Sequence, residues 1–584
     1  MRQQSRRNGR TRGPRERSVR YVTLLVCLAL LLVALGGRLV WLQLVAGPAY
    51  AQAALEQRNR EVEIPPQRGS IYDREGEPLA VTMAARTIYA VPPVVVDPDG
   101  AATALASILG GDVAYYRAQL TKDSSFAYIA RKVDIERAEA VEALAIAGIF
   151  TQEDFRRVYP SNELACHVLG FVGVDDIGLE GIEKQYESVL HGTAGKVIAE
   201  KGVGGYPIPG GVTLEEPAVN GQNIVLTIDN DIQYEAHVAL QAAVKKHGAK
   251  SGSVVIMDPD TGAILAAAST PTFDPNAYGT ASSAAKRLRP LVDAYEPGST
   301  IKSITAAAVI EKGLFTPQSM FKLPSTLKVG GRTISESHGR PTVTWSLTEI
   351  VTNSSNVGAV KLGMALGEDG LYDSFESFGL TEKTGVDFPG EVKGWLPPTS
   401  QWSASSIGNI PFGQGISVTA LQLLRANAAI ANGGELVTPH FLGSFPDDPE
   451  QTVTWPKKRV ISAETAAQMR QVMKAVVEEG TGADARVEGY AVAGKTGTAQ
   501  KVRTDGRGYA TGKYIGSFLG FLPADDPAVI IVVTIDEPTK GYYGGTVAAP
   551  TFARLGAYCM THLKIPPATA AAGAEESNSE VTGD

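Results

Sequence analysis

The stretch EPGSTIKSITAAAVIEKG, residues 296–313, predicts a tight turn followed by one apolar helix that ends at a glycine. It places the hydroxyl of Ser299 and the amine of Lys302 three positions apart, on one face of that helix. A serine hydroxyl is a weak nucleophile until a base removes its proton, and a buried lysine with a lowered pKa can be that base. The stretch therefore predicts an activated serine carried by a helix.

The SxxK spacing by itself does not select Ser299, because it occurs four times in the chain. The other pairs are Ser283/Lys286, Ser319/Lys322 and Ser325/Lys328. They run into KRLRP, LPS and VGGR, and none of these continues as a buried helix. We expect those three pairs to lie in solvated loops.

Composition excludes some functional classes. A chain of 584 residues has room for two or more domains and a large core. Three cysteines, Cys27, Cys166 and Cys559, are too few for a disulfide framework. The seven histidines form no HExxH or other ligand pattern. We expect no disulfide, no metal site and no cofactor.

The N-terminal end combines a basic arm with an apolar stretch. Residues 1–20 hold eight Arg and one Glu, about +7, so the rest of a chain with net charge −8 carries about −15. YVTLLVCLALLLVALGGRLVWLQLVA, residues 21–46, holds one charge, Arg38, and is long enough to cross a bilayer. The arginines then predict a cytoplasmic N-terminus with the remaining chain outside, and no nucleic-acid partner.

A cleaved signal peptide is the alternative to a transmembrane anchor. The sequence shows no small-residue cleavage site, and the apolar stretch resumes after Arg38 instead of ending there. These two features favour an anchor that stays attached.

Changes in composition divide the rest of the chain. Residues 47–217 mix alternating and helical stretches and become rich in Gly and Pro from 202 to 211, which suggests a hinge. We expect a first domain at 47–217 and a second at 218–565. Residues 566–584 are small and acidic without a basic residue, and we expect them to be a disordered tail.

The second domain begins and ends with predicted strands. GSVVIMD at 252–258 and AILAAA at 263–268 predict a hairpin after a helix. Three further strands are predicted at 490–501, 515–523 and 528–536, with mainly helical segments between the two groups. This order predicts an α/β fold, an antiparallel sheet closed by both ends of the domain, with a helical insertion.

Residues 489–496, GYAVAGKT, match the phosphate-loop pattern GxxxxGK[ST] and would suggest a nucleotide-hydrolysing enzyme. A phosphate loop needs a helix that begins at its Lys-Thr, whereas GTAQKVRTDGRGYATGK follows here. We therefore expect Lys495-Thr496-Gly497-Thr498 to be a strand, where Gly497 lets a substrate backbone lie close. A second KTG, 383–385, lacks strand flanks and is expected to be structural.

The third element is Ser354-Ser355-Asn356, the one SxN in the chain. SxxK, then SxN, then KTG is the ordered triplet of penicillin-recognising serine acyltransferases. EPGSTIK, NSSNVG (353–358), FGQGISVTALQL (412–423) and GYAVAGKTGTAQ (489–500) resemble the transpeptidase domain of class B penicillin-binding proteins. RGSIYDREGEPLA (68–80), RVYPSNELACHVLGFVG (157–173) and GLEGIEKQYESVLHGTAG (178–195) resemble the pedestal domain of that class.

The resemblance covers residues 38–555. Within the class, the sequence is most similar to the division-type, FtsI-like septal enzyme. An elongation-type or sporulation relative is the alternative within the class. The resemblance implies an antiparallel five-stranded sheet with helices on both faces and a helical subdomain. An α+β pedestal domain and a single transmembrane helix would precede it.

The resemblance also implies a reaction on peptidoglycan stem peptides. Ser299 would attack the D-Ala-D-Ala carbonyl, expel the terminal D-Ala and hold the remainder as an acyl ester, which an amine of a second stem resolves. Lys302 would be the base, with its pKa lowered by the helix N-terminus and by Lys495. β-Lactams would acylate the same serine.

Further roles carry over to the other motif residues. Ser354 would relay a proton, and Asn356 would hydrogen-bond the acyl side chain. Lys495, Thr496 and Thr498 would hold the terminal carboxylate. The backbone N–H groups of Ser299 and Thr498 would form the oxyanion hole.

The resemblance places the protein in the bacterial cytoplasmic membrane at the division septum. Its partners would be a SEDS-family, FtsW-like glycosyltransferase and other divisome proteins, because the chain has no room for a glycosyltransferase domain. Two alternatives stay open. A serine hydrolase, either a β-lactamase or a DD-carboxypeptidase, would release the acyl group to water, and a catalytically idle scaffold would only recruit partners.

Overall fold

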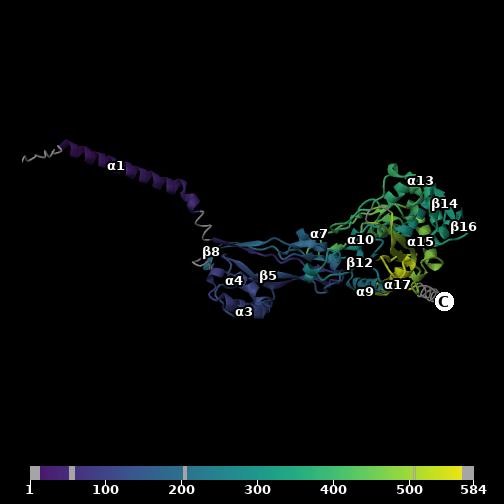
Figure 1. The fold of residues 1–584 in the computed structure, drawn as a ribbon, viewed down its shortest axis with the longest axis horizontal. Helices are drawn as coiled ribbons and strands as arrows, with labels where there is room; N and C mark the ends of the chain where they lie inside the picture. Colours follow the sequence, from purple (N-terminus) through teal and green to yellow (C-terminus); the bar gives the residue numbers. More distant parts are fainter. Residues whose placement is uncertain (1–13, 52–58, 202–206, 504–505, 507, 568–584) are drawn as a thin grey trace, which may run out of the picture. The chain divides into compact units, whose positions relative to one another are not determined.

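The computed structural model describes residues 14–51, 59–201, 207–503, 506 and 508–567 (Figure 1). The chain divides into two compact units, residues 1–66 with 193–219 and residues 67–192 with 220–584. The start of the basic arm and nearly all of the expected acidic tail lie outside the described residues. The domain boundaries at 217 and 565 stay predictions.

The first unit contains a long apolar helix. Helix α1 (Pro14–Val40) continues into the short π-helix η1 (Trp41–Val45). Among the described residues, Ser18–Val45 is the one helix long and apolar enough to cross a membrane. The stretch expected at 21–46 coincides with this helix, which fits a single-pass membrane protein.

An antiparallel sheet completes the first unit. Its strands, in order, are β1 (Asn59–Ile64), β8 (Gly195–Lys201) and β9 (Pro207–Glu216). The hinge expected at 202–211 is therefore wrong for residues 207–211. Gly and Pro in this stretch indicated a break, but the pairing of Ala199 with Val212 and of Lys201 with Pro207 continues the sheet.

The second unit begins with a mixed sheet in the order β18-β10-β2-β3-β4, with β5 also paired to β3. The strands are β2 (Ile71–Tyr72), β3 (Pro78–Ala90), β4 (Ala127–Val133), β5 (Ile149–Val158), β10 (Ile224–Leu226) and β18 (Leu442–Ser444). Because β10 and β18 follow residue 217, this sheet joins segments of both predicted domains. Helices α3 (Pro98–Leu109), α4 (Val113–Leu120) and α5 (Ile135–Glu142) enclose a small separate core with β3 and β4.

A buried carboxylate ties three segments of this region together. Glu183, which is fully buried, accepts hydrogen bonds from Arg68 Nε at 2.7 Å, Arg157 Nε at 2.6 Å and the Tyr159 hydroxyl at 3.1 Å. Burial alone would raise the pKa of Glu183, but the charges of the two arginines outweigh burial and the pKa is lowered. The carboxylate is therefore held ionised between two guanidinium groups.

The five-stranded sheet has the order β12-β11-β22-β21-β20, and all of its neighbouring strands are antiparallel. The strands are β11 (Ser251–Met257), β12 (Ile264–Thr270), β20 (Ala493–Val502), β21 (Tyr509–Leu522) and β22 (Val529–Asp536). β11 pairs with β22, so the two ends of the domain meet in the sheet. The predicted sheet is confirmed.

Helices cover both faces of this sheet, as predicted. On β22, Ile531 and Val533 pack with α9 (Asn230–His247) and α17 (Ala549–His562), which are labelled in Figure 1. Ile530 and Val532 belong to the opposite core, with α11 (Lys302–Glu311), α14 (Ala420–Ala431) and α15 (Ala463–Glu478). A strand buried on both faces needs consecutive apolar residues, which accounts for the run VIIVV at 529–533.

The insertion between the early and late strands is only partly helical. Besides α10 (Arg289–Val292), α12 (Leu347–Thr352) and α13 (Asn356–Ser377), it contains the strand pairs β13 (Met320–Leu323) with β16 (Val343–Ser346), β14 (Thr326–Val329) with β15 (Arg332–Ser335), and β17 (Glu435–Leu436) with β19 (Lys458–Arg459). Lys322 and Lys328 lie in β13 and β14, so the expectation of solvated loops is wrong for these two SxxK pairs. The glycines of VGGR close a hairpin, because Gly330 and Gly331 adopt positive φ there.

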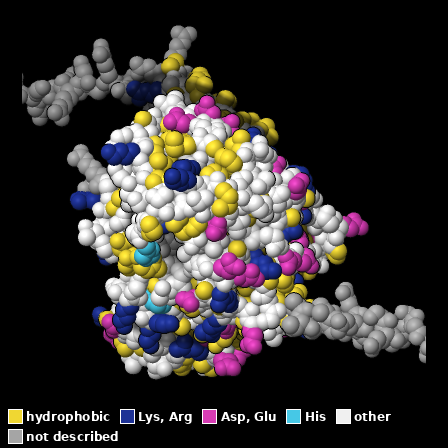
Figure 2. Space-filling view, turned by 90° about the vertical axis from the view of Figure 1, so that its right-hand side faces the viewer, with side chains coloured by type: hydrophobic (Ala, Val, Ile, Leu, Met, Phe, Trp, Pro, Cys, Tyr) yellow, Lys and Arg dark blue, Asp and Glu magenta, His cyan; other side chains and the backbone are white. Residues whose placement is uncertain are grey.

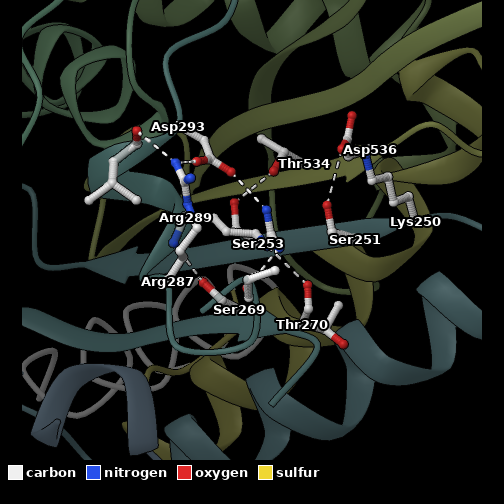
Figure 3. Close-up of polar contacts among 12 residues, drawn as sticks. Lys250, Ser251, Ser253, Ser269, Thr270, Arg287, Arg289, Asp293, Thr534 and Asp536 are labelled. Carbon is white, nitrogen blue, oxygen red and sulfur yellow. Dashed lines mark hydrogen bonds and ion pairs between the residues drawn. The ribbon is translucent and has the colours of Figure 1, made fainter. Parts of the chain in front are cut away.

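The segment that leads from β12 toward Ser299 is fixed to the sheet by Arg289. The backbone N–H of Arg289 donates to Ser269 Oγ at 3.0 Å, and the Arg289 Nε donates to the carbonyl of Thr270 at 3.1 Å (Figure 3). Its Nη1 donates to Asp293 at 2.9 Å. Arg289 and Asp293 line a cavity of 510 Å³, which is lined also by Glu296, three residues before Ser299.

Charged side chains of both signs share the molecular surface. Figure 2 shows Lys and Arg side chains mainly on the lower part of one face, with Asp and Glu side chains beside them. A surface that binds a polyanion needs a continuous basic stretch. The charges on the face shown are mixed.

Glu183→Gln is expected to destabilise the region around β3 and β5 by about 3–5 kcal/mol, because it removes the carboxylate charge that two buried guanidinium groups share and leaves Arg68 paired with the partly exposed Glu187. Hydrogen exchange measured by mass spectrometry should accelerate in peptides that cover residues 68–82 and 157–183. Glu187→Gln is the matched control. Glu187 also contacts Arg68, at 2.8 Å, but is 30% exposed, so its loss should cost below about 1 kcal/mol. Equal hydrogen exchange in the two variants would contradict the conclusion that the buried Glu183 carboxylate stabilises this region.

Candidate active site

Ser299 lies in a short 3-10 helix, η4 (Gly298–Ile301), that leads directly into α11. Lys302 is the first residue of α11, so the expected helical pair spans the junction of two helix types. Gly298 has φ +55°, and a Cβ at this position would lie 3.2 Å from the carbonyl oxygen of Thr498. The glycine therefore allows the serine turn to approach β20.

The amine of Lys302 is buried and held by three acceptors. It donates to the Ser354 carbonyl at 2.6 Å, to Asn356 Oδ1 at 2.8 Å and to Ser354 Oγ at 3.3 Å. The hydroxyl of Ser299 makes no hydrogen bond to another described residue. The structure thus joins Lys302 to the SxN motif, while no hydrogen bond links the side chains of Ser299 and Lys302.

Two buried amines influence each other in this site. Burial lowers the pKa of Lys302 well below its ordinary value, the charge of Lys495 lowers it further, and the carboxylate of Glu336 raises it. Lys495 is fully buried, and burial lowers its pKa to about 7. The expected influence of Lys495 on Lys302 is found, but burial, not the helix N-terminus, is the main cause.

The SxN motif occupies the turn between α12 and α13. Ser354 has φ +55°, a left-handed conformation that is uncommon outside glycine and is retained only where surrounding contacts enforce it. Ser355 is the N-cap of α13, because its hydroxyl accepts the N–H of Gly358 at 2.9 Å. Ser354 and Asn356 therefore reach Lys302, while Ser355 caps the helix.

The KTG motif lies in a strand, as expected. Lys495 to Thr498 are part of β20, the edge strand of the sheet, and no helix begins at Lys495-Thr496. The phosphate-loop interpretation is thereby excluded. The second KTG is outside any strand, and the N–H and hydroxyl of the buried Thr384 both donate to Glu391, which gives it a structural role.

Gly497 allows close packing behind the strand. A Cβ at this position would lie 2.8 Å from Thr300 Cγ2, 3.2 Å from the carbonyl oxygen of Pro297 and 2.3 Å from Ser517 Oγ. Its missing side chain therefore brings η4 against β20. The approach of a substrate backbone at Gly497 stays a prediction.

One cavity of 640 Å³ gathers most of the expected residues. Its lining includes Ser299, Ser354, Asn356, Thr496 and Thr498. Lys302 and Lys495 are buried behind this lining, and Gly497 faces the packing described above. The three motifs therefore surround a common space.

Sequence reasoning missed an aromatic border of this cavity. Tyr514 on β21 stacks on Tyr542 with ring centres 4.4 Å apart, and Tyr543 lies 5.4 Å from the ring of His338. The run YYGG at 542–545 was the available signal. Gly544, at the start of α16 (Gly544–Val547), donates its N–H to the Thr498 hydroxyl at 3.1 Å.

Thr481 was missed as well. Its hydroxyl lies 2.9 Å from that of Thr496, and it lines the same cavity. It follows α15, in a turn that no motif marks. Thr496 is therefore oriented by a residue outside the KTG sequence.

Comparisons with known proteins agree with this architecture. A model of the penicillin binding protein transpeptidase domain matches residues 252–556, and one of the penicillin-binding protein dimerisation domain matches residues 63–226. The chain is 37% identical to stage V sporulation protein D of Bacillus subtilis, over 91% of this chain and 83% of that protein. It is 33% identical to peptidoglycan D,D-transpeptidase FtsI of Escherichia coli, over 94% and 93%.

A solved structure has the same fold. The crystal structure of penicillin binding protein 3 from Mycobacterium tuberculosis, complexed with aztreonam, matches with a TM-score of 0.69 and 31% identity. The match covers 87% of this chain and 98% of that one.

Fold, motifs and relatives together define a penicillin-binding transpeptidase, and the chain belongs to the class B penicillin-binding proteins. Its enzymatic class is peptidoglycan D,D-transpeptidase. The predicted family and enzyme class are confirmed. Division, elongation and sporulation members of the class fit the comparisons equally.

Lys495→Met is expected to alter the pH dependence of stability. The pKa of Lys495 is about 7 in the folded chain and about 10.4 in an unfolded one, so the unfolded state binds more protons between these values. The free energy of unfolding therefore gains a contribution that rises with pH across this window, and the variant lacks it. The Tm of the wild type relative to the variant should increase from pH 6.5 to 9.

Lys501→Met is the matched control for this measurement. The pKa of Lys501 is raised through its contacts with Asp536 and Glu537, despite the opposing effect of burial. Lys501 stays protonated in both states up to pH 9, so its Tm difference should stay constant. A constant difference for Lys495→Met as well would show that Lys495 keeps its proton on folding.

Proposed function

We propose that the chain cross-links peptidoglycan through an acyl ester on Ser299. The observation that carries the proposal is the convergence of three motifs on one cavity, with the buried amine of Lys302 bonded to Ser354 and Asn356 beside it. A neutral amine in that position is a base with access to the serine turn.

In the acylation step, the neutral amine of Lys302 takes the proton of the Ser299 hydroxyl. The serine oxygen bonds to the carbonyl carbon of the D-Ala-D-Ala peptide bond, and the C–N bond then breaks. The departing D-Ala amine receives this proton from Lys302 through Ser354, which returns Lys302 to its neutral form. The neutral amine has two N–H groups, so this step requires it to release one of its three acceptors and to turn its lone pair toward the Ser299 hydroxyl, which donates to it.

In the second step, an amine of another stem peptide attacks the ester carbonyl. The new amide bond forms, the ester C–O bond breaks, and the proton of the amine returns through Ser354 to the serine oxygen. Asn356 hydrogen-bonds the acyl side chain and keeps it in place. The enzyme regains its starting protonation.

Edge strand β20 supplies the rest of the substrate site in this proposal. Alternate backbone groups of an edge strand are free to pair with an extended peptide. The backbone N–H groups of Ser299 and Thr498 stabilise the oxyanion, each contributing about 3–4 kcal/mol. Lys495 supplies positive charge for the terminal carboxylate, and the hydroxyls of Thr496 and Thr498 bind it.

The cellular setting is proposed from the N-terminal arm and from the relatives of the chain. The arginine-rich arm supports a cytoplasmic N-terminus, with the enzyme outside the membrane. The similarity to FtsI supports septal synthesis from lipid II-derived stems, with an FtsW-like SEDS glycosyltransferase and other divisome proteins as partners. The similarity to stage V sporulation protein D supports a sporulation role as the second candidate.

Fluorescent penicillin is expected to label the detergent-solubilised full-length chain covalently, and Ser299→Ala should reduce labelling below detection, because the variant lacks the attacking oxygen. Ser325→Ala, at another SxxK match, should label like the wild type. Gel fluorescence after denaturation measures the bound label. Labelling that persists in Ser299→Ala would refute the assignment.

A fluorescent fusion expressed from the native locus is expected to gather at midcell, and depletion should give long cells without septa. Midcell enrichment in growing cells supports the division role. A lateral distribution with rounded cells on depletion would identify an elongation enzyme, and expression confined to sporulation would identify the second candidate.

A further inference from the structure

A carboxylate that no motif includes lies behind the SxN turn. The side chain of Glu336, just after β15, is 7% exposed. Its Oε1 accepts the Ser355 hydroxyl at 2.6 Å, and its Oε2 accepts the backbone N–H of Asn356 at 2.6 Å. Both carboxylate oxygens are therefore directed at the residues that follow Ser354.

Arg340 fixes this carboxylate from the other side. Its Nη2 donates to Glu336 Oε1 at 2.5 Å, and its Nη1 donates to the carbonyl of Leu323 at 3.1 Å. The guanidinium carbon lies 4.7 Å from the ring centre of Trp345. The carboxylate also lies at the N-terminus of α13, where the helix dipole favours an anion.

The contacts of Glu336 continue to the amine of Lys302. Asn356 Nδ2 donates to the Ser335 carbonyl at 3.0 Å, so its Oδ1 is left to accept from Lys302 at 2.8 Å. Ser354 supplies the other two acceptors while it holds φ +55°. A strained turn keeps such a conformation only when its neighbours are fixed.

We propose that Glu336 is a positioning residue for acylation, which holds the SxN turn through Ser355 and Asn356 in the geometry that binds the Lys302 amine. The inference rests on the proposed role of Lys302 as base. It concerns the support of the turn, and Glu336 itself does not contact the reacting atoms.

The charge of Glu336 gives the role a second, measurable consequence. Glu336 raises the pKa of Lys302, against the lowering by burial and by Lys495. Arg340 is paired with Glu336, and the titratable groups that line the cavity are His338, Asp484, Tyr514, Tyr542 and Tyr543. Removal of the carboxylate charge therefore lowers the pKa of Lys302, and the neutral amine persists to lower pH.

The test uses the full-length chain in detergent, with stopped-flow acylation by fluorescent penicillin from pH 5.5 to 9.5. Glu336→Gln is expected to lower the acylation rate constant about 10- to 100-fold, while the dissociation constant of the initial penicillin complex stays within about twofold of the wild-type value. The acidic limb of its pH–rate profile, where the rate falls as Lys302 is protonated, should move to lower pH. Glu336→Asp retains the charge, so it should keep the limb in place and recover part of the rate. Glu368→Gln, exposed on α13, is the matched control and should behave as wild type.

The outcomes separate this inference from the proposed function. If Glu336→Gln keeps the wild-type rate and the wild-type acidic limb of the pH–rate profile, the positioning role is overturned. It is also overturned if the Gln and Asp variants lose the same amount of rate and the acidic limb does not move. If thermal unfolding shows that Glu336→Gln does not fold, Glu336→Asp decides: a reduced rate with unchanged dissociation constant supports the role, and a wild-type rate overturns it. Reaction of Ser299→Ala would refute the proposed site, whereas an inert Ser299→Ala beside an unaffected Glu336→Gln refutes this inference alone.

Discussion

The burial of the Lys302 amine is the constraint on which the candidate active site depends. An amine removed from water favours its neutral form and needs acceptors for its N–H groups. Ser354 and Asn356 provide these acceptors, and Lys495 opposes protonation. The arrangement exists only because η4 with α11, the α12–α13 turn and β20 converge at one place. The fold therefore has to bring together residues that lie far apart along the chain.

The five-stranded sheet provides that convergence. Its inner strands carry apolar side chains on both faces, so helices are anchored on each side and α11 cannot shift without opening a core. The edge position of β20 leaves backbone groups beside η4 available, and Gly298 and Gly497 let the two segments approach. The same two contacts place the Ser299 turn and the KTG strand on one cavity.

The sequence was sufficient for the parts of this structure that depend on local patterns. Consecutive apolar residues predicted the strands, and Ser299, Ser354 and Lys495 were found because their motifs are short and ordered. Glu336 and the tyrosines were missed, because their roles arise from contacts such as that of Glu336 with Asn356, 20 residues apart. The absence of a Ser299–Lys302 hydrogen bond was missed for the same reason. Helix spacing indicates which side chains can meet, but it does not indicate which acceptors from other segments a buried amine binds. The hinge expectation failed at residues 207–211 because Gly and Pro also occur in paired strands.

The order of strands in the five-stranded sheet also determines when the domain can form. Its middle strand, β22, is the last of the five to be synthesised, and it is the partner that β11 needs. A nascent chain that has already produced all three motifs still holds two separate groups of strands with an unfilled gap between them. Closing that gap joins segments distant along the chain, which is a slow event. The cavity that the three motifs line thus forms only after β22 has been made, and a chain cut short before residue 529 would hold the three motifs without that cavity.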